Sequence, residues 1–531
     1  QALDTNSTGS NNVAVGNSAL TANSTAGWNT GVGFRALTSN TTGTPNTAVG
    51  SDALRDNTTG ADLTAVGSGA LAANTGSNNT AVGRNALSAN TTGTGNTGVG
   101  KDSLKANTTA NNNTALGRTS LYQNTTGTSN TGLGVNALYI NTTGSNCTAV
   151  GLSALEQNNG NNNTALGYQA ALSNTTGTDN VAIGYNSLYT NTTGNNCVAI
   201  GYDALYVSNG ANNIAIGNAA LQDLTTGHSN TAIGYQAGLN QTTALYNTFI
   251  GDRSAGSGVV TGQKNTAIGH YTLYELTSGT NNVAVGANAL DVNTTGGYNN
   301  AVGQNSLGAN TTGSSNTAMG QDALANNTTA SNNVAVGKGA LTNNTTGAQN
   351  TALGQSALNA NTTASYATAV GYNALAAHTT GVNNSAFGST AGDSITTGSY
   401  NVAVGNNALT SLTTNNYNVA IGNNSQIYAS GSYNTSIGAE ALEGVQDSST
   451  GNANTAIGFR SLEDYTTGHN NVAIGYQAGY QITTGHENVA IGSAALDALT
   501  TGNDHVAVGY AALSALTTGA RCTAVGYAAG A

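Results

Sequence analysis

Residues 47–60 read TAVGSDALRDNTTG, and near-copies of this stretch fill the whole chain. The clearest anchor is the glycine after the Ala-Val or Ala-Ile pair, which stands at Gly16, Gly33, Gly50 and Gly67 and recurs as far as Gly526. There are 31 such glycines, and the 510 residues between the first and the last give a mean step of 17. A fixed period of this kind indicates a repeat array rather than several separate globular domains.

The repeat is too short for paired helices, which need about 33 residues or more per unit. The apolar spacing is also wrong for a helix, because Val49 and Leu54 lie five apart with Gly50 between them. An Asn-Thr-Ala-Val segment and an Ala-Leu segment, both expected to be β, fit one coil closed by a glycine corner and an Asn-Thr-Thr-Gly turn. Glycine at these corners supplies positive φ. The sequence therefore predicts an all-β fold: a parallel β-solenoid, or β-roll, of about 31 coils that runs through residues 1–531 as one continuous array.

Stacked coils place like residues above like residues, so we expect ladders of Asn, Thr and Leu along the array. Asn ladders stabilise such stacks through side-chain amide hydrogen bonds. Two steps are longer than the rest: Gly251 to Gly269 is 18 residues and Gly438 to Gly458 is 20. We expect both insertions to bulge outward as small polar loops without breaking the stack.

The strand segment is apolar on both faces. Its third position is Val, Ile or Leu, as in Val15 and Ile183, and its second position is nearly always Ala, as in Ala14 and Ala182. A strand of this kind is covered on both sides. We expect the larger residue to pack inside the coil and the Ala face to meet further copies of the chain, most simply in a trimer. The alternative is an Ala face left exposed at little cost.

One later position of the repeat changes character along the chain. It is Asn in early repeats, as in Asn40 and Asn57, and often Leu or Ile later, as in Leu224, Ile395 and Ile482. We interpret this position as partly shielded, in a groove between chains.

Composition excludes several classes of function. Charged residues make up 6% of the chain and the net charge is −11 with no basic cluster, which argues against nucleic-acid binding. No run of 18 apolar residues exists, so no membrane span is expected. The chain enters and leaves the repeat partway, and neither end has the polar coil that caps a solenoid. We therefore expect an uncapped segment of a longer fibre, or chains that abut end to end.

Two runs of sequence carry a family resemblance. Residues 471–475 and 488–492 both read NVAIG, which resembles the head repeats of trimeric autotransporter adhesins. That resemblance implies three left-handed parallel β-rolls side by side, and heads that bind host or matrix surfaces. The family's usual repeat is shorter, and the extra residues here fall in the Asn-Thr-Thr-Gly turn. Residues 316–329 are also similar to repeats of tail-fibre-like proteins, which are often followed by an endosialidase-type chaperone.

The chain offers few chemically reactive side chains. Cys147, Cys197 and Cys522 share one position, directly before the strand. The first two lie three coils apart, roughly 14 Å at the usual strand spacing, which is too far for a disulfide. They are either small buried side chains or partners that meet across an oligomer axis. The six His have no recurring partners, and no acidic pair recurs at a fixed spacing, so we predict no catalytic, cofactor or metal site and no enzyme.

Tyrosines recur directly after the anchor glycine. They could stack on glycans, or they could simply cover an outer corner of each coil. The residues in question are Tyr168, Tyr185, Tyr202, Tyr235, Tyr372, Tyr476, Tyr510 and Tyr527.

The Asn-Thr-Thr turn also matches the acceptor sequence for N-linked glycosylation. The alternative is a turn kept for its geometry alone, and glycans one coil apart would crowd each other. The candidate acceptors are Asn40, Asn57, Asn90, Asn107, Asn124, Asn141, Asn174, Asn191, Asn293, Asn310, Asn327, Asn344 and Asn361.

Taken together, these features predict the structural shaft of an extracellular fibre at the cell surface, adhesin-like, with itself as partner and a host surface, matrix or glycan as a further partner. One alternative is the shaft of a virion tail fibre. The other is a water-ordering or ice-binding solenoid, since Thr-Thr persists where the preceding Asn changes to Leu. The two Thr point to opposite sides, so only one of them can form an outer ladder.

Overall fold

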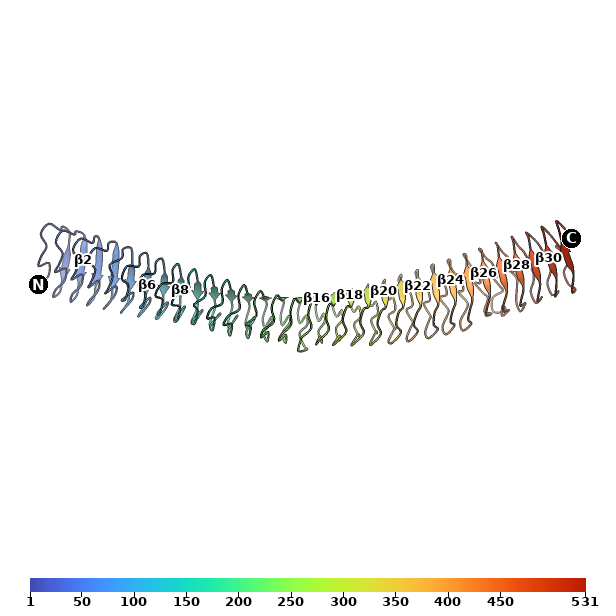
Figure 1. Cartoon of the computed structure of the whole chain (residues 1–531), viewed down its shortest axis with the longest axis horizontal. Coiled ribbons are helices and arrows are strands. Elements are labelled where there is room, and N and C mark those ends of the chain that lie inside the picture. Colours follow the sequence, from blue (N-terminus) through green and yellow to red (C-terminus); the bar gives the residue numbers. More distant parts are fainter. The chain divides into compact units, whose positions relative to one another are not determined.

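The computed structural model describes residues Gln1–Ala531 and confirms an all-β chain in which each repeat forms one coil of a parallel solenoid. The chain divides into two compact units, Gln1–Lys264 and Asn265–Ala531. Figure 1 shows, in either unit, short strands that follow one another in chain order, one strand to a coil. The predicted repeat of about 17 residues is thus the structural repeat.

The first unit contains fifteen strands. They are β1 Val13–Val15, β2 Asn29–Val32, β3 Asn46–Val49, β4 Leu63–Val66, β5 Thr80–Val82, β6 Thr97–Val99, β7 Thr114–Leu116, β8 Thr131–Leu133, β9 Thr148–Val150, β10 Thr164–Leu166, β11 Val181–Ile183, β12 Val198–Ile200, β13 Ile214–Ile216, β14 Thr231–Ile233 and β15 Thr248–Ile250.

The second unit contains sixteen strands. They are β16 Thr266–Ile268, β17 Val283–Val285, β18 Asn300–Val302, β19 Thr317–Met319, β20 Val334–Val336, β21 Thr351–Leu353, β22 Thr368–Val370, β23 Ser385–Phe387, β24 Val402–Val404, β25 Val419–Ile421, β26 Thr435–Ile437, β27 Thr455–Ile457, β28 Val472–Ile474, β29 Val489–Ile491, β30 Val506–Val508 and β31 Thr523–Val525.

Within each unit, every strand pairs in parallel with the next strand along the chain. The register places like residues together: Ala48 pairs with Ala65, and Val49 pairs with Val66. The same register recurs between β28 and β29, where Ala473 pairs with Ala490. The sequence repeat therefore sets the strand register directly.

The Ala-Leu segment is not a second strand, contrary to the expectation from sequence. The Leu adopts a left-handed backbone conformation, with φ of 52° at Leu54, so the chain turns there instead of extending. It still bonds to the next coil, because the Leu54 N–H donates to the Ala70 carbonyl at 3.0 Å. Each coil therefore has one short strand, and turns with their own inter-coil hydrogen bonds make up the rest.

The anchor glycine is required for two reasons. Gly50 has φ of 134°, which side chains rarely adopt, and a Cβ there would lie 2.7 Å from the Gly67 carbonyl. The turn glycine differs from it. Gly60 has no positive φ, contrary to expectation, and Ala110 takes the equivalent place in a later coil. Gly60 reflects close packing beside the Asn57 side chain rather than backbone strain.

Buried asparagines form the ladder that the sequence predicts. Asn57 Nδ2 donates both to Asn40 Oδ1 in the preceding coil, at 3.0 Å, and to the Gly60 carbonyl in its own turn, at 3.0 Å. A second column lies directly before the strands, where the Asn113 backbone N–H donates to Asn96 Oδ1 at 3.0 Å. Each such bond is worth about 1 kcal/mol, and losing one partner leaves a buried polar group unsatisfied.

The core is built from a Leu and a strand Ala that recur along the chain and are fully buried in most coils, as are Leu54 and Ala48. The fit is close enough that volumes compensate. Phe249 replaces the usual Ala in β15, and Gly238 then replaces the Leu of the neighbouring coil; a Cβ on Gly238 would lie 3.1 Å from the Phe249 ring. Protein interiors are close-packed, so adding or removing a single methylene group in the core changes stability.

The later-repeat Leu and Ile residues also lie in this core, so their predicted place in a groove between chains is wrong. Leu224, Ile395 and Ile482 are all buried within their own coils. In two coils they fill space left by a missing Leu: Ile395 lies beside Gly392 and Ile482 beside Gly479. The Asn ladder and this apolar packing are alternative fillings of one interior site.

The longer of the two insertions leaves the stack intact, as predicted. Strands β26 and β27 pair in register across the 20-residue step, with Thr435 opposite Thr455. Residues 445–448 are exposed, whereas Ser449 is buried and its Oγ donates to the Tyr465 carbonyl at 2.6 Å. Ser449 thus closes the loop onto the solenoid.

The loop of the first insertion, residues 256–260, rests on the preceding coil. Asn240 Nδ2 donates to the Ser257 carbonyl at 3.0 Å, and Val260 is buried and forms a β-bridge with Gln241. The inward Val260 therefore anchors the loop, whereas its neighbour Val259 is exposed.

Candidate interaction surface

The outward face of the strands carries an exposed or half-exposed apolar residue in every coil. Alternation along each strand sends the residue before the last inward and the residues on either side of it outward. Ala48 is fully buried, whereas Val49, Val66 and Val82 each keep 37% of their surface exposed. The expected arrangement, with Val inside and Ala outside, is therefore wrong.

The reason for this reversal is the space that the Leu occupies. The Ala site has little room beyond a Cβ: at Gly98, which takes the Ala place in β6, a Cβ would already lie 3.4 Å from Leu87 and 3.0 Å from Ser103 Oγ. A Val side chain inside the coil would overfill it, so the larger residue of the pair faces out.

The outward face thus forms a continuous apolar row in each unit. We refer to the last residues of the strands as the outer row, so that Val49 of β3 and Val66 of β4 belong to it. Its exposed members include Val15, Leu116, Leu133 and Leu166 in the first unit and Ile268, Val302, Met319, Leu353, Phe387, Ile421 and Ile437 in the second. Large exposed apolar patches on soluble proteins commonly mark interaction sites, so the outer row is the candidate interaction surface of the chain.

The tyrosines after the anchor glycine form stacks wherever they occur in consecutive coils. Tyr168, Tyr185 and Tyr202 lie one above another, with ring centroids 5.0 and 5.1 Å apart and nearly parallel planes. Tyr510 stacks on Tyr527 in the same way, at 5.1 Å. A sugar can therefore not stack on the inner faces of these rings, because neighbouring tyrosines cover them.

The remaining members of the predicted tyrosine set have different neighbours. Tyr235 lies under the Arg253 guanidinium, 5.4 Å from the ring centroid, and Tyr476 stacks on Phe459. Tyr372 is half-exposed and has Gln355 and Ser389 at the equivalent places of the adjoining coils. The set therefore does not form one continuous platform.

The glycosylation candidates all lie inside the solenoid. Every one of them is fully buried, and each Nδ2 donates to the carbonyl three residues along its own turn, as in Asn57 to Gly60 and Asn310 to Gly313. The folded coil has no room for a glycan on that nitrogen, so the structure supports the turn-geometry alternative. This applies to Asn40, Asn57, Asn90, Asn107, Asn124, Asn141, Asn174, Asn191, Asn293, Asn310, Asn327, Asn344 and Asn361.

The paired threonines of the turn face different surroundings, as expected. Thr41 Oγ1 donates to the Thr58 carbonyl of the next coil at 3.0 Å, and Thr91 bonds to Thr108 in the same way. The second Thr of each pair, as in Thr42 and Thr92, is exposed. The second Thr is therefore exposed throughout, whereas the first is half-buried in most coils and exposed in some, as at Thr58 and Thr91.

The cysteines are free thiols. Cys147 and Cys197 are buried in the Asn column before the strands, and burial raises the pKa of both thiols. The Cys147 Sγ lies 3.2 Å from the Gly160 carbonyl, where an Asn amide would otherwise donate. These two residues match the interpretation as small buried side chains, and Cys522 is partly exposed.

A histidine replaces one asparagine of the turn ladder. His378 is fully buried, with Nδ1 3.2 Å from Asn361 Oδ1 and Nε2 3.0 Å from Asn384 Nδ2. The amide N–H of Asn384 donates to Nε2, so a second ring proton would have no acceptor there. This arrangement holds the imidazole neutral.

We expect His378 to make the array sensitive to acid. Burial lowers its pKa from 6.5 to about 4. Because this pKa is lower in the folded state, stability is intact above pH 6.5 and falls as the pH drops toward about 4, by up to about 3 kcal/mol. His378→Asn restores the ladder and should remove this part of the loss. Urea unfolding of the wild-type chain and of His378→Asn, at neutral pH and at about pH 4.5, measures the loss of stability in acid. An equal loss in the two proteins would contradict the role of His378.

An acidic cluster lies on the turns of the second unit. Carboxylate oxygens of Glu440, Glu443 and Glu463 lie within 4.8 Å of one another. Arg460 Nε lies 2.6 Å from Glu440 and 3.4 Å from Glu463, so the cluster already has a cationic partner. Burial raises the pKa of Glu463 to about 7, against the opposing effect of the Arg460 charge.

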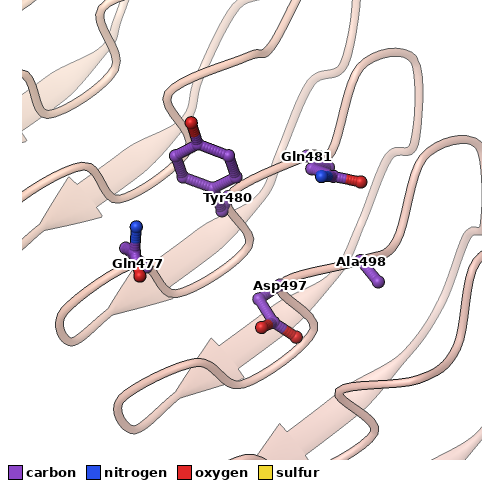
Figure 2. Close-up of a pocket in the computed structure, with 5 residues that line it drawn as sticks. All are labelled: Gln477, Tyr480, Gln481, Asp497 and Ala498. Carbon is purple, nitrogen blue, oxygen red and sulfur yellow. The ribbon is translucent and has the colours of Figure 1, made fainter.

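One coil further along is a shallow polar pocket of about 250 Å³, lined by Gln477, Tyr480, Gln481, Asp497 and Ala498 (Figure 2). These side chains come from the turns that follow β28 and β29. Burial raises the pKa of the Asp497 carboxyl. The pocket contains amide, phenol and carboxylate groups but no nucleophile paired with a base, so it suits a small polar molecule better than a reaction.

Comparison with known proteins does not assign the chain to a family. No protein-family model matches the sequence, and no curated protein matches it. The structure contains no helix that is both long and apolar enough to cross a lipid bilayer. The resemblance to adhesin heads and tail-fibre repeats thus rests on the NVAIG and related motifs alone.

Proposed function

We propose that this chain is the structural shaft of an extracellular fibre, adhesin-like and exposed at a cell surface, in which parallel copies associate through their outer rows. The carrying observation is the outer row itself, an apolar surface that recurs in every coil of both units. A passive shaft needs no catalytic group, and we assign no enzymatic activity to the chain. A virion tail fibre would use the same shaft.

Self-association is supported by the chemistry of the row. Val, Ile and Leu recur at a constant spacing with no charged residue among them, so a second copy in the same register meets like with like. Closing this face also protects a long sheet from sideways aggregation. We propose three copies in parallel, because the motif resembles that of trimeric adhesin heads.

The mass of the assembled chain tests this proposal. Sedimentation equilibrium or light scattering on the intact protein should give three times the chain mass of 52.4 kDa. The mass of a dimer would support self-association of the chain but would contradict the proposal of three copies. A stable monomer with its outer row in water would reject the shaft model.

A second candidate function is the ordering of water or the binding of ice. It is favoured by the strand face of the first unit. In strands β2 to β10, an exposed or half-exposed Thr stands two residues before each outer-row residue, from Thr30 in β2 to Thr164 in β10. That face is a regular lattice of hydroxyl and methyl groups. Inhibition of ice recrystallisation by the monomer, and none by an oligomer, would support this function over the first.

A further inference from the structure

The tyrosine stack in coils β10 to β12 has a geometry suited to covalent modification. Tyr168, Tyr185 and Tyr202 each follow an anchor glycine, and their ring planes differ by only 10° and 5°. The backbone fixes this spacing: the Tyr168 carbonyl accepts from Asn186, and the Tyr185 carbonyl accepts from Asp203, both at 3.0 Å.

The rings are accessible at their edges although their inner faces are covered. Tyr168, Tyr185 and Tyr202 keep 41%, 45% and 52% of their surface exposed. A small oxidant can therefore reach each phenol, and the nearest ring to any of them is another phenol one coil away. Tyr189 and Tyr206 form a second stacked pair in the same coils, at 5.1 Å, which adds to the local density of phenols.

We propose that the Tyr168–Tyr185–Tyr202 stack is a site of oxidative cross-linking, at which a peroxidase-class oxidant joins neighbouring rings as dityrosine. The link would fasten successive coils that are otherwise held by hydrogen bonds and packing. This inference does not rest on the proposed shaft function.

The chemistry balances with hydrogen peroxide as the co-reactant. Each of two phenols gives up one electron and one proton from its O–H group, and the peroxide is reduced to two water molecules. The resulting radicals couple through one carbon–carbon bond between the ring carbons next to the hydroxyls. The hydrogen on each coupled carbon then moves to oxygen and restores both phenols. Holding the rings in neighbouring coils raises their effective concentration, as for any intramolecular reaction.

The test treats the intact chain with a peroxidase and hydrogen peroxide, then maps the cross-links by mass spectrometry. Digestion with elastase separates Tyr185 from Tyr202, because it cuts after small residues such as Val198 and Ala199. We expect blue dityrosine fluorescence and linked peptide pairs containing Tyr185 with Tyr168 or Tyr202. Both pairs should be lost in Tyr185→Phe, which keeps the stacked ring but lacks the phenol.

Two controls make the result specific. Tyr372→Phe removes an equally exposed tyrosine with no stacked neighbour and should leave the linked pairs unchanged. The wild-type chain oxidised in guanidinium should lose the preference for these pairs, and circular dichroism confirms that Tyr185→Phe retains the fold. The proposal is overturned if links form only between chains, if they involve Tyr372 as often as Tyr185, or if the stacked tyrosines are oxidised without coupling.

Discussion

Gly50→Ala is expected to destabilise its region of the array by about 4 kcal/mol, through backbone strain and overpacking together. The residue has φ of 134°, and its new methyl would lie 2.7 Å from the Gly67 carbonyl in the next coil. A carbonyl in a hydrogen-bonded stack cannot move aside cheaply. Urea unfolding of the intact chain and hydrogen exchange of the adjoining coils should both report the loss.

Gly69→Asn is the matched control. Gly69 has φ of 71°, but Asp52 and Asn85 occupy the same place in neighbouring coils at φ of 60° and 57°. A Cβ at this position would meet only the end of the Asn85 side chain, which can move aside. We expect a change within about 1 kcal/mol, since Asn tolerates this conformation. Equal losses in the two variants would show that the glycine corner carries no special constraint.

Charging the outer row should dissociate the assembly into single chains. The design places Lys and Glu alternately at the last residue of every strand from β3 to β14, beginning with Val49→Lys and Val66→Glu. Alternation puts opposite charges one coil apart, which supports the stack itself. Burying such charges against a second copy is costly, so sedimentation should show the chain mass alone while circular dichroism stays unchanged.

The same alternation in the exposed second threonines of the turns is the control for this experiment. It begins with Thr42→Lys and Thr59→Glu and adds comparable charge on a different surface. We expect the assembly to survive it. Dissociation by both designs would indicate a general effect of charge, and dissociation by the control alone would move the interface to the turns.

The repeat period predicted most of the fold, because a 17-residue spacing fixes coil, register and ladders together. The Asn57 to Asn40 bond and the in-register pairing across the second insertion both follow from it. The period could not predict which residues of the strand face the interior of the coil. Alternation says that Ala48 and Val49 face opposite ways, but only the space left by the buried leucines, as by Leu87 beside Gly98, decides which residue of the pair faces inward. Leu54 itself looked like a strand residue because its left-handed backbone leaves no mark in the composition.

The candidate sites were harder to predict than the fold. The Asn-Thr-Thr sequence is compatible both with a glycosylation site and with a buried hydrogen-bond ladder. Only the burial of residues such as Asn57 distinguishes these two interpretations. The tyrosine stack was readable in principle, since Tyr168, Tyr185 and Tyr202 are each 17 residues apart. The period predicts a column of tyrosines, but it does not predict that neighbouring rings lie face to face, because that depends on the side-chain rotamers.

The hydrogen bond that joins Leu54 to Ala70, and its counterparts in other coils, span about one repeat in sequence. Every finished coil is therefore a template for the one that follows, and within each unit folding can proceed by elongation once a first pair of coils has formed. Elongation also makes length an adjustable property. Adding or removing whole 17-residue coils keeps every ladder in phase, whereas a few extra residues are absorbed as an outward loop, as in residues 445–448.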